Sequence, residues 1–277
     1  MSDLADIRLV VSDIDGTLVR HDKSLSVGNI AAVARLKAAG VAMSLISARP
    51  MSGIWPIADA LQLDGPFGAF NGGTVFDRNG VIGEPRRLEP AVALRILAIL
   101  DAASVDVWLF AHGHWYARQC DGPHVPREKQ SAGVMPTLRD DLGALCGSAD
   151  KIVGVSDDAA LLKQLEARVQ SATLGQATVA LSQPYFLDST ALLANKGDGV
   201  SAVAAAMGVP LTQVAVLGDM ANDLPMFARA GVSFAMGQAP EAVRTAADRT
   251  TASNEDDGVA QAIDLLIAAA RTKREPT

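Results

Sequence analysis

The segment Arg8–Leu18, with the sequence RLVVSDIDGTL, constrains the fold of this chain more than any other stretch. It includes most of the run Ile7–Val11, which is rich in β-branched residues and too short for a buried helix, so it predicts a buried strand. Two carboxylates follow, Asp13 and Asp15, and in extended chain residues two apart point the same way. We therefore expect both carboxylates in one small space where the strand ends.

Two carboxylates this close raise each other's pKa unless a cation lies between them. A hard divalent ion such as Mg²⁺, which takes oxygen ligands, relieves that repulsion. Gly16 lets the backbone turn sharply and approach a ligand closely. Taken alone, the segment is also compatible with a calcium loop or a solvated turn.

The rest of the chain shows two kinds of sequence pattern. Short apolar strands such as 41–46, 214–217 and 232–236 alternate with helices over short joints, which predicts a doubly wound, Rossmann-like parallel sheet. Between them lies a block with its own helices and strand pairs. We therefore predict an α/β fold in which residues 1–84 and 189–277 form a discontinuous core and residues 85–188 form an inserted α/β cap domain.

Polar residues stand at several element ends of the predicted core. In open α/β sheets, ligands bind beyond the carboxyl ends of the strands. A hydroxyl and a guanidinium before a helix N-terminus suit an anion, and an Asn-Gly pair between short apolar runs predicts a hairpin turn. The residues concerned are Asp13, Asp15, Ser47, Arg49, Asn71, Lys196, Asp219, Asn222 and Asp223.

These motifs resemble, in order, the four motifs of the haloacid dehalogenase superfamily. Asp13-Ile-Asp-Gly-Thr17 is similar to the first motif in its phosphatase form, and the segment 218–227 is especially similar to the fourth motif of the Cof-type (type IIB) sugar phosphatases. Ala48 departs mildly from the Thr-Gly-Arg often found at the second motif. That branch also carries a large cap where this chain has its insertion, and the resemblance covers essentially the whole chain.

The resemblance implies a magnesium-dependent phosphoric monoester hydrolase that acts on small phosphorylated metabolites, sugar phosphates being expected. Asp13 would be the nucleophile that forms an aspartyl-phosphate, and Asp15 would first give and then take a proton. Mg²⁺ would be held by the carboxylate of Asp13, the main-chain carbonyl of Asp15 and the carboxylate of Asp219.

The same resemblance implies roles for the other polar residues. Ser47, Lys196 and Asn222 would hold the transferring oxygens, and Asp223 would orient Lys196 or a metal-bound water. Arg49 and Asn71 would contact the substrate. The cap would close over the site and choose the leaving group, with His124, Arg127, Glu128 and Tyr185 as candidate contacts.

Two other functions use a similar arrangement of residues. A phosphomutase or phosphotransferase would share this core but needs a path that returns the phosphoryl group to a substrate. A non-enzymatic phospho-acceptor signalling module also uses an acidic pocket and a lysine, but it needs only one small domain, so the insertion and Asp15 argue against it.

Composition bounds the setting. The formal charge of −7 argues against nucleic acid as the main partner, because a phosphate backbone needs a basic surface. Two cysteines, Cys120 and Cys146, are too few for a disulfide framework and fit free thiols in a reducing compartment. No apolar run is long enough to span a membrane and the N-terminus lacks a secretory signal pattern, so we expect a cytoplasmic protein.

Overall fold

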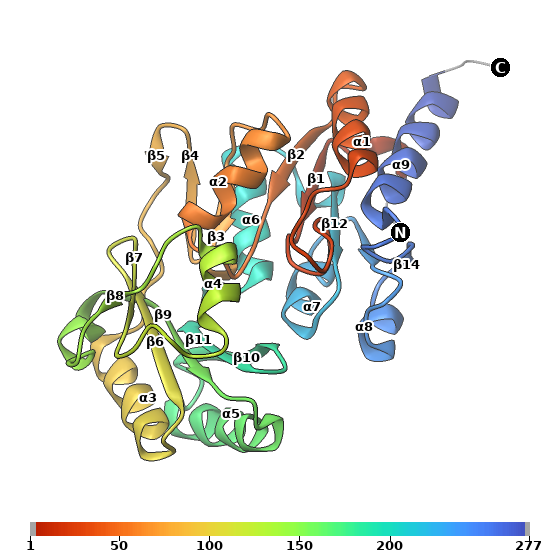
Figure 1. Cartoon of the computed structure of the whole chain (residues 1–277). Coiled ribbons are helices and arrows are strands. Elements are labelled where there is room, and N and C mark those ends of the chain that lie inside the picture. Colours follow the sequence, from red (N-terminus) through yellow and green to blue (C-terminus); the bar gives the residue numbers. More distant parts are fainter. Residues whose placement is uncertain (1–3, 275–277) are drawn as a thin grey trace.

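The computed structural model of the chain describes residues 4–274, and it has two parts (Figure 1). A core with a parallel sheet lies above a second part with an antiparallel sheet, the cap. The helices and strands of the core before the cap are η1 Leu4–Asp6, β1 Leu9–Ser12, α1 Val27–Ala38, β2 Ala42–Leu45, α2 Met51–Ala60, β3 Phe67–Ala69, η2 Phe70–Gly72, β4 Thr74–Asp77 and β5 Gly80–Val81.

After the cap the chain returns to the core. Its remaining elements are α6 Lys196–Ala206, η4 Leu211–Gln213, β12 Val214–Gly218, η5 Ala221–Asp223, α7 Leu224–Phe227, β13 Val232–Ala235, α8 Glu241–Ala246, β14 Arg249–Thr250 and α9 Gly258–Arg274.

The core sheet is parallel and has the order β14-β13-β12-β1-β2 in the described chain. Alternate residues of its strands are buried on opposite faces, where Val10 packs with α1, α2 and α9, and Val11 packs with α6, α7 and α8. Helices therefore cover both faces, and the predicted doubly wound sheet is confirmed.

Local signals fix the ends of the core helices. Ser26 caps α1, since its hydroxyl accepts a hydrogen bond from the Asn29 amide. The Asn71-Gly72 turn joins β3 to β4 with Asn71 in the left-handed region, at φ 58°, as the hairpin prediction requires.

The cap is built on an antiparallel sheet with one short parallel edge strand. Its order is β10-β11-β9-β6-β7-β8. The cap elements are α3 Pro90–Ala102, β6 Asp106–Ala111, β7 His114–Ala117, α4 Val125–Ala132, β8 Thr137–Leu138, η3 Gly143–Ser148, β9 Ala149–Val155, α5 Ala159–Thr173, β10 Ala177–Gln183 and β11 Phe186–Ala191.

The two faces of the cap sheet have different neighbours. Helices α3 and α5 cover the face away from the core, over Leu109, Ile152 and Leu187 (Figure 1). The other face turns its aromatic residues towards the core, where the rings of Phe110 and Phe70 lie 5.9 Å apart. This inner face is the one that can meet a ligand bound at the core.

Helix α4 of the cap packs against the core, and the sequence patterns did not predict it. It docks on α2 of the core, where Ser52 Oγ donates a hydrogen bond of 2.6 Å to the carbonyl of Ala132. Gly53 sits so close to the carbonyl of Ser131 that a Cβ atom at residue 53 would overlap it. The sequence of α4, VPREKQSA, is polar and starts with proline at its second residue, so no apolar periodicity marks it as a helix.

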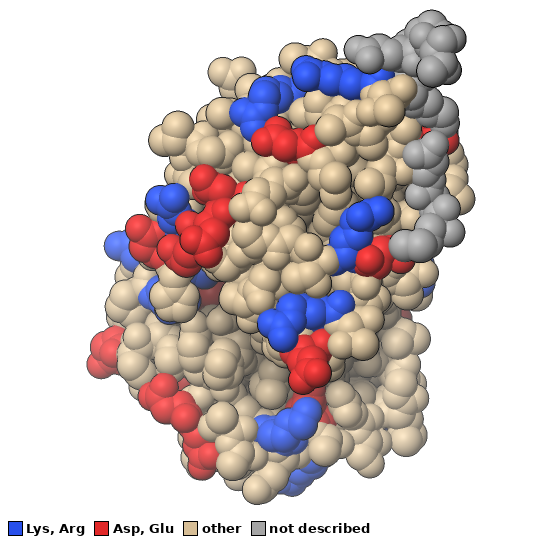
Figure 2. All heavy atoms as spheres, turned by 90° about the vertical axis from the view of Figure 1, so that its right-hand side faces the viewer, with Lys and Arg blue, Asp and Glu red and all other residues tan. Residues whose placement is uncertain are grey.

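The surface seen in Figure 2 carries Lys and Arg side chains interspersed with Asp and Glu. Mixed signs of this kind are usual on the surface of a globular protein. Within residues 4–274, none of the helices combines the length and apolar character needed to cross a bilayer.

Candidate active site

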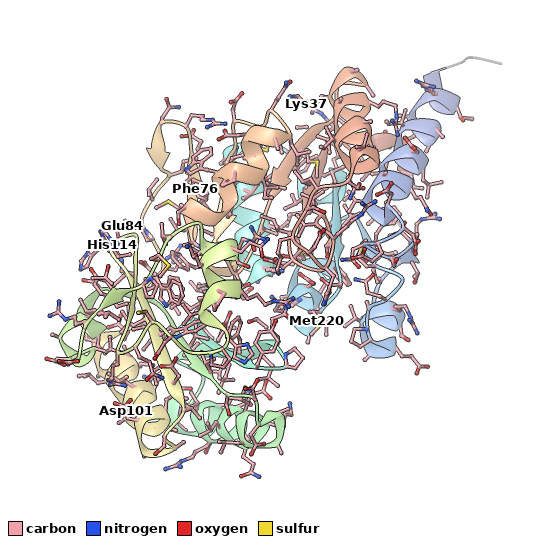
Figure 3. All side chains as sticks on the ribbon, viewed as in Figure 1. Lys37, Phe76, Glu84, Asp101, His114 and Met220 are labelled. Atoms are coloured by element: carbon pink, nitrogen blue, oxygen red, sulfur yellow. The ribbon has the colours of Figure 1, made fainter. Side chains whose placement is uncertain are left out.

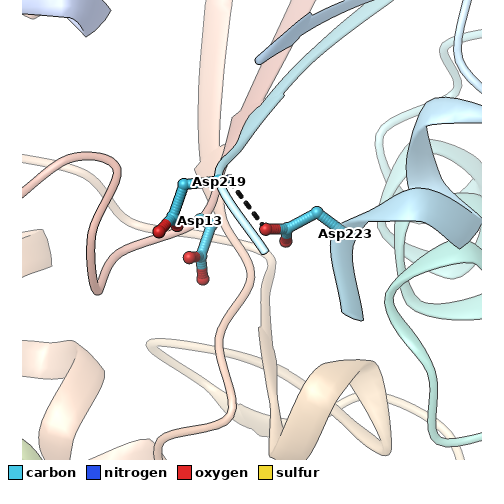
Figure 4. A group of neighbouring side chains, drawn as sticks. All are labelled: Asp13, Asp219 and Asp223. Atoms are coloured by element: carbon cyan, nitrogen blue, oxygen red, sulfur yellow. Dashed lines mark hydrogen bonds between the residues drawn. The ribbon is translucent and has the colours of Figure 1, made fainter. Parts of the chain in front are cut away.

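Asp13 and Asp219 lie close together because β1 and β12 are neighbouring strands. The strands run parallel, with Ser12 beside Leu217, so both end at the same edge of the sheet. Asp13 follows β1 and Asp219 follows β12, and Figure 4 shows their carboxyl groups side by side. Both are buried, with exposed fractions of 4% and 7%.

The turn after Asp13 holds Asp219 in place. Thr17 Oγ1 donates a hydrogen bond of 2.9 Å to Asp219 Oδ1. Gly16 has a φ of +84°, and a Cβ atom there would overlap the carboxylate of Asp219. A glycine is therefore required both by the backbone conformation and by the close approach of this carboxylate.

Lys196 is the buried cation of the site. It begins α6, and its Nζ lies 2.7 Å from Asp13 Oδ1 and 2.6 Å from Asp223 Oδ1. Burial alone would lower the pKa of Lys196, but the charges of Asp13 and Asp223 outweigh it and raise that pKa. The lysine is therefore charged and fixed beside Asp13.

Both carboxylate oxygens of Asp223 accept hydrogen bonds within the core. Its Oδ1 accepts from Lys196, and its Oδ2 accepts from the backbone amides of Asp219 and Met220 at 2.8 and 2.9 Å. Figure 4 shows the bond between Asp219 and Asp223. This carboxylate therefore positions Lys196 and the loop after β12.

A divalent cation fits between Asp13 and Asp219. Among the described residues, one acidic group has ligand atoms close enough to share an ion, Asp13, Asp219 and Asp223, all within 4.8 Å of one another. Because Asp223 is already engaged, Asp13 and Asp219 remain as ligands. Burial and the neighbouring carboxylates raise the pKa of both, and oxygen donors of this kind suit Mg²⁺.

The side chain of Asp15 lies away from this group. Arg49 donates to both of its oxygens, at 2.7 and 2.8 Å, and Lys23 Nζ lies 2.5 Å from Oδ1. Burial alone would raise the pKa of Asp15, but Arg49 and then Lys23 hold it well below its usual range. In this arrangement Asp15 is ionised, contrary to the expectation of a carboxyl group protonated at the start, and Arg49 contacts Asp15.

The other predicted core residues, Ser47, Asn222 and Asn71, also lie near this edge of the sheet. Ser47 and Asn222 line the same pocket as Asp13 and Lys196. The side chain of Asn222 also donates to Asn71 Oδ1 at 3.3 Å, and Asn71 lines a chamber beside the pocket. Met220 extends towards the cap where the two parts face each other (Figure 3).

The cap roofs this pocket and leaves little room. The enclosed space is about 60 Å³, enough for a few water molecules. Arg127, Glu128 and Tyr185, three of the four predicted cap contacts, line it. The fourth, His124, lies behind the pocket wall with its ring stacked on Tyr185 at 4.3 Å. A phosphate group fits this volume, and the rest of a larger substrate needs either the open side of the pocket or a movement of the cap.

Three charged residues at or beside the pocket were missed by the motif reading. Lys23 lies in the loop after the first motif, and Lys151 and Asp188 lie in cap strands β9 and β11. The sequence did hold a signal for the two strand residues. Lys151 is two residues from Val153 and Asp188 is two residues from Phe186, so each points to the same face of its strand as a buried apolar side chain. A charge on the buried face of a strand is unusual enough to mark a site.

Comparison with known proteins agrees with this geometry. A family model described as haloacid dehalogenase-like hydrolase matches residues 10–263. A pyridoxal phosphate phosphatase of Escherichia coli is 26% identical over 271 residues, which cover 92% of this chain and 97% of the relative. A solved haloacid dehalogenase-like hydrolase from Bacteroides thetaiotaomicron is 28% identical, with a TM-score of 0.82 over 94% of this chain and 99% of its own.

The cap arrangement has a solved counterpart too. A sugar phosphatase of haloacid dehalogenase subclass IIB gives a TM-score of 0.81 over 93% of this chain and 98% of its own. At 22% identity this likeness concerns the fold. The likeness covers both the core and the cap of this chain, since it extends over 93% of its residues.

Proposed function

The chain belongs to the haloacid dehalogenase-like hydrolase family, and from this premise we propose that it is a magnesium-dependent phosphatase of small phosphomonoesters. The reaction would pass through an aspartyl-phosphate on Asp13. The observation that carries this proposal is the buried group in which Lys196 Nζ lies 2.7 Å from Asp13, with Asp219 alongside.

In the first step, one carboxylate oxygen of Asp13 attacks phosphorus, and the bond from phosphorus to the ester oxygen breaks. Lys196 offsets the repulsion between the anionic ester and Asp13. Ser47 and Asn222, which line the same pocket, would donate hydrogen bonds to the transferring phosphoryl oxygens. A Mg²⁺ ion held by Asp13 and Asp219 would neutralise charge on the phosphoryl group.

Proton transfer falls to Asp15. It would protonate the leaving alcohol and then accept a proton from the water that hydrolyses the aspartyl-phosphate, so that inorganic phosphate and free Asp13 are regenerated. Because Arg49 and Lys23 hold Asp15 ionised in this arrangement, the role requires both cations to move off its carboxylate and Asp15 to take up a proton from solvent before the ester bond breaks. An incoming dianionic phosphate is a competing partner for them, which would couple substrate entry to the release of Asp15.

The substrate would be a small phosphorylated metabolite, with a sugar phosphate as the first expectation, handled in the cytoplasm. The cap supports a small substrate, since residues of α4 and β11 lie over the pocket and, within the described chain, leave no long groove beside Asp13 for a large leaving group. The phosphatase relative acts, by its name, on pyridoxal phosphate, another small phosphomonoester.

Release of inorganic phosphate from p-nitrophenyl phosphate, with and without Mg²⁺, tests the proposal. Wild-type protein should turn over only with the ion, and Asp13→Asn should remain folded by thermal melting while losing turnover. Intact-protein mass spectrometry should show a phosphate adduct on a quenched wild-type reaction. Turnover by Asp13→Asn would overturn the nucleophile assignment, and phosphate found on a second alcohol in place of water would favour a phosphotransferase.

A further inference from the structure

The inner face of the cap carries charges that the catalytic steps do not use. Glu128 projects from α4, Lys151 from β9 and Asp188 from β11, and at least nine-tenths of each residue is buried. In the register of the sheet, Asp188 pairs with Val153 and Lys151 pairs with Thr190, so the two charges are diagonal neighbours on one face. They form a short row, which we call the cap row: Glu128, Lys151 and Asp188.

Asp188 lacks the partners that a buried carboxylate needs. Neither of its oxygens has a hydrogen-bond partner among residues 4–274, although the residue is only 4% exposed. The nearest cation is Lys151 Nζ, at 3.6 Å, which is beyond hydrogen-bonding distance. Buried polar groups are nearly always satisfied, so an unsatisfied carboxylate beside the site is a candidate contact for a ligand.

The space beside Asp188 opens towards the catalytic pocket. Asp188 lines a chamber of about 110 Å³ that shares Ser182, Lys196 and Asn222 with the wall of that pocket. Glu128 and Lys151 line the catalytic pocket itself, together with Tyr185, whose hydroxyl also lacks a partner within the described chain. The cap row therefore faces the region that an alcohol leaving group would occupy next to Asp13.

We propose that the cap row recognises hydroxyl groups of the leaving alcohol, so that the preferred substrate is the phosphate ester of a sugar or other polyol. The proposal rests on the phosphatase function above and adds the residues that choose its substrate. Each hydroxyl both donates and accepts, and the row offers an acceptor, a donor and an acceptor in turn.

The charges of the row argue against other leaving groups. A second phosphate or a carboxylate placed against the row would face two buried carboxylates, Glu128 and Asp188, and would have to reach Arg127 elsewhere on the pocket wall for a cation. An ammonium group would lie next to Lys151, which already donates to the Ala48 carbonyl and cannot leave its place without losing that bond. An apolar alcohol would leave Asp188 buried and unpaired, which is costly.

Specificity constants for a matched substrate set test the proposal. The set contains ribose 5-phosphate, glucose 6-phosphate, their 2-deoxy counterparts, phosphoethanolamine and p-nitrophenyl phosphate. Wild-type enzyme should prefer at least one of the two sugar esters over p-nitrophenyl phosphate. In Asp188→Asn, the ratio of kcat/KM for that ester to kcat/KM for p-nitrophenyl phosphate should fall by roughly 10- to 100-fold, as expected for a lost hydrogen bond to a charged group.

Asp150→Asn is the matched control. Asp150 is the neighbour of Lys151 on the same strand and is equally buried, but it pairs with Arg87 and lines a hollow away from the catalytic pocket. It should leave the ratio unchanged. Glu128→Gln should lower the ratio in the same direction as Asp188→Asn, and thermal melts identify any variant that fails to fold.

The possible failures are distinguishable. If wild-type enzyme releases phosphate from none of these esters with Mg²⁺, the phosphatase proposal itself is contradicted. If it turns over p-nitrophenyl phosphate but prefers phosphoethanolamine, or if folded Asp188→Asn and Glu128→Gln keep the wild-type ratio, the phosphatase stands and the cap row has no role in choosing the alcohol.

Discussion

The core and the cap both bury charged side chains, but they satisfy them differently. In the core, Lys196 bridges Asp13 and Asp223, and Asp223 accepts two further backbone hydrogen bonds. In the cap, Asp188 has no hydrogen-bond partner among the described residues, and its nearest cation is 3.6 Å away.

In the proposed enzyme, this difference would separate two tasks. Groups that must act on every substrate are held in place before any substrate arrives, and such preorganisation is what lowers a reaction barrier. Groups that choose among substrates remain unsatisfied until a matching ligand completes them, because an unpaired buried group is what penalises the wrong ligand. The predictions below test whether the two regions are divided in this way.

The largest effect should follow removal of the core cation. Lys196→Met leaves Asp13 and Asp223 buried without their shared partner, so we expect kcat to fall by roughly 10³-fold and the protein to lose about 3–5 kcal/mol of stability. Lys163→Met, at an exposed cap lysine, is the control and should match wild type. Phosphate release measures the change in kcat, and urea unfolding measures the change in stability. A Lys196→Met enzyme with near-normal kcat would contradict the catalytic role given to the core charges.

A glycine in each region sharpens the comparison. Gly16→Ala forces an overlap with Asp219 as well as an unfavourable φ, so kcat should fall by roughly 10²-fold and the Mg²⁺ concentration for half activity should rise. Gly113 in the cap has a similar φ of +76° but open space around it, so Gly113→Ala should cost only about 1 kcal/mol of stability. Equal kinetics in the two variants would show that the approach to Asp219 is unimportant.

The contact between α2 and α4 tests closure of the cap on the core. A side chain in Gly53→Ala would overlap the Ser131 carbonyl and hold the two helices apart, so we expect kcat/KM for the preferred ester to fall by roughly 10-fold. Ser52→Ala removes only the hydrogen bond to Ala132 and should lose a few-fold at most, about 1 kcal/mol. Small-angle scattering should show a larger radius of gyration for Gly53→Ala; unchanged scattering and kinetics would argue against closure at this contact.

The smallest effect concerns stability against pH in the cap. Burial raises the pKa of Glu128 from 4.5 to about 7, so the folded protein binds this proton more tightly than the unfolded chain. The resulting stability is present below pH 4.5 and is lost as pH rises through about 7. Glu128→Gln should therefore become more stable than wild type as pH rises, by up to about 3 kcal/mol at pH 8.

Urea unfolding at several pH values measures the difference in unfolding free energy between Glu128→Gln and wild type. Glu241→Gln, at an exposed core carboxylate, is the control. A gap between Glu128→Gln and wild type that stays constant with pH would mean that Glu128 is not a buried carboxylate in solution.

The sequence allowed much of the core to be predicted and little of the cap site. Asp13, Gly16 and Asp219 belong to local patterns in which a strand, a turn and a carboxylate are consecutive, and parallel pairing of β1 and β12 then brings the patterns together. Lys151 and Asp188 have no such local pattern, because their meeting depends on the register of two antiparallel strands. The clamp of Arg49 on Asp15 was missed for the same reason, since it depends on side-chain positions across two loops.

The return of the chain from cap to core also limits how such enzymes can be recombined. Strand β11 carries Asp188 and ends at Ala191, and α6 opens at Lys196 after only a short crossing. A chimera that imports a foreign cap as a cassette would need its downstream junction inside that crossing. A junction placed earlier would separate the imported sheet from its last strand, the position of Asp188 here. A later one would replace Lys196, to which the proposed mechanism gives a catalytic role.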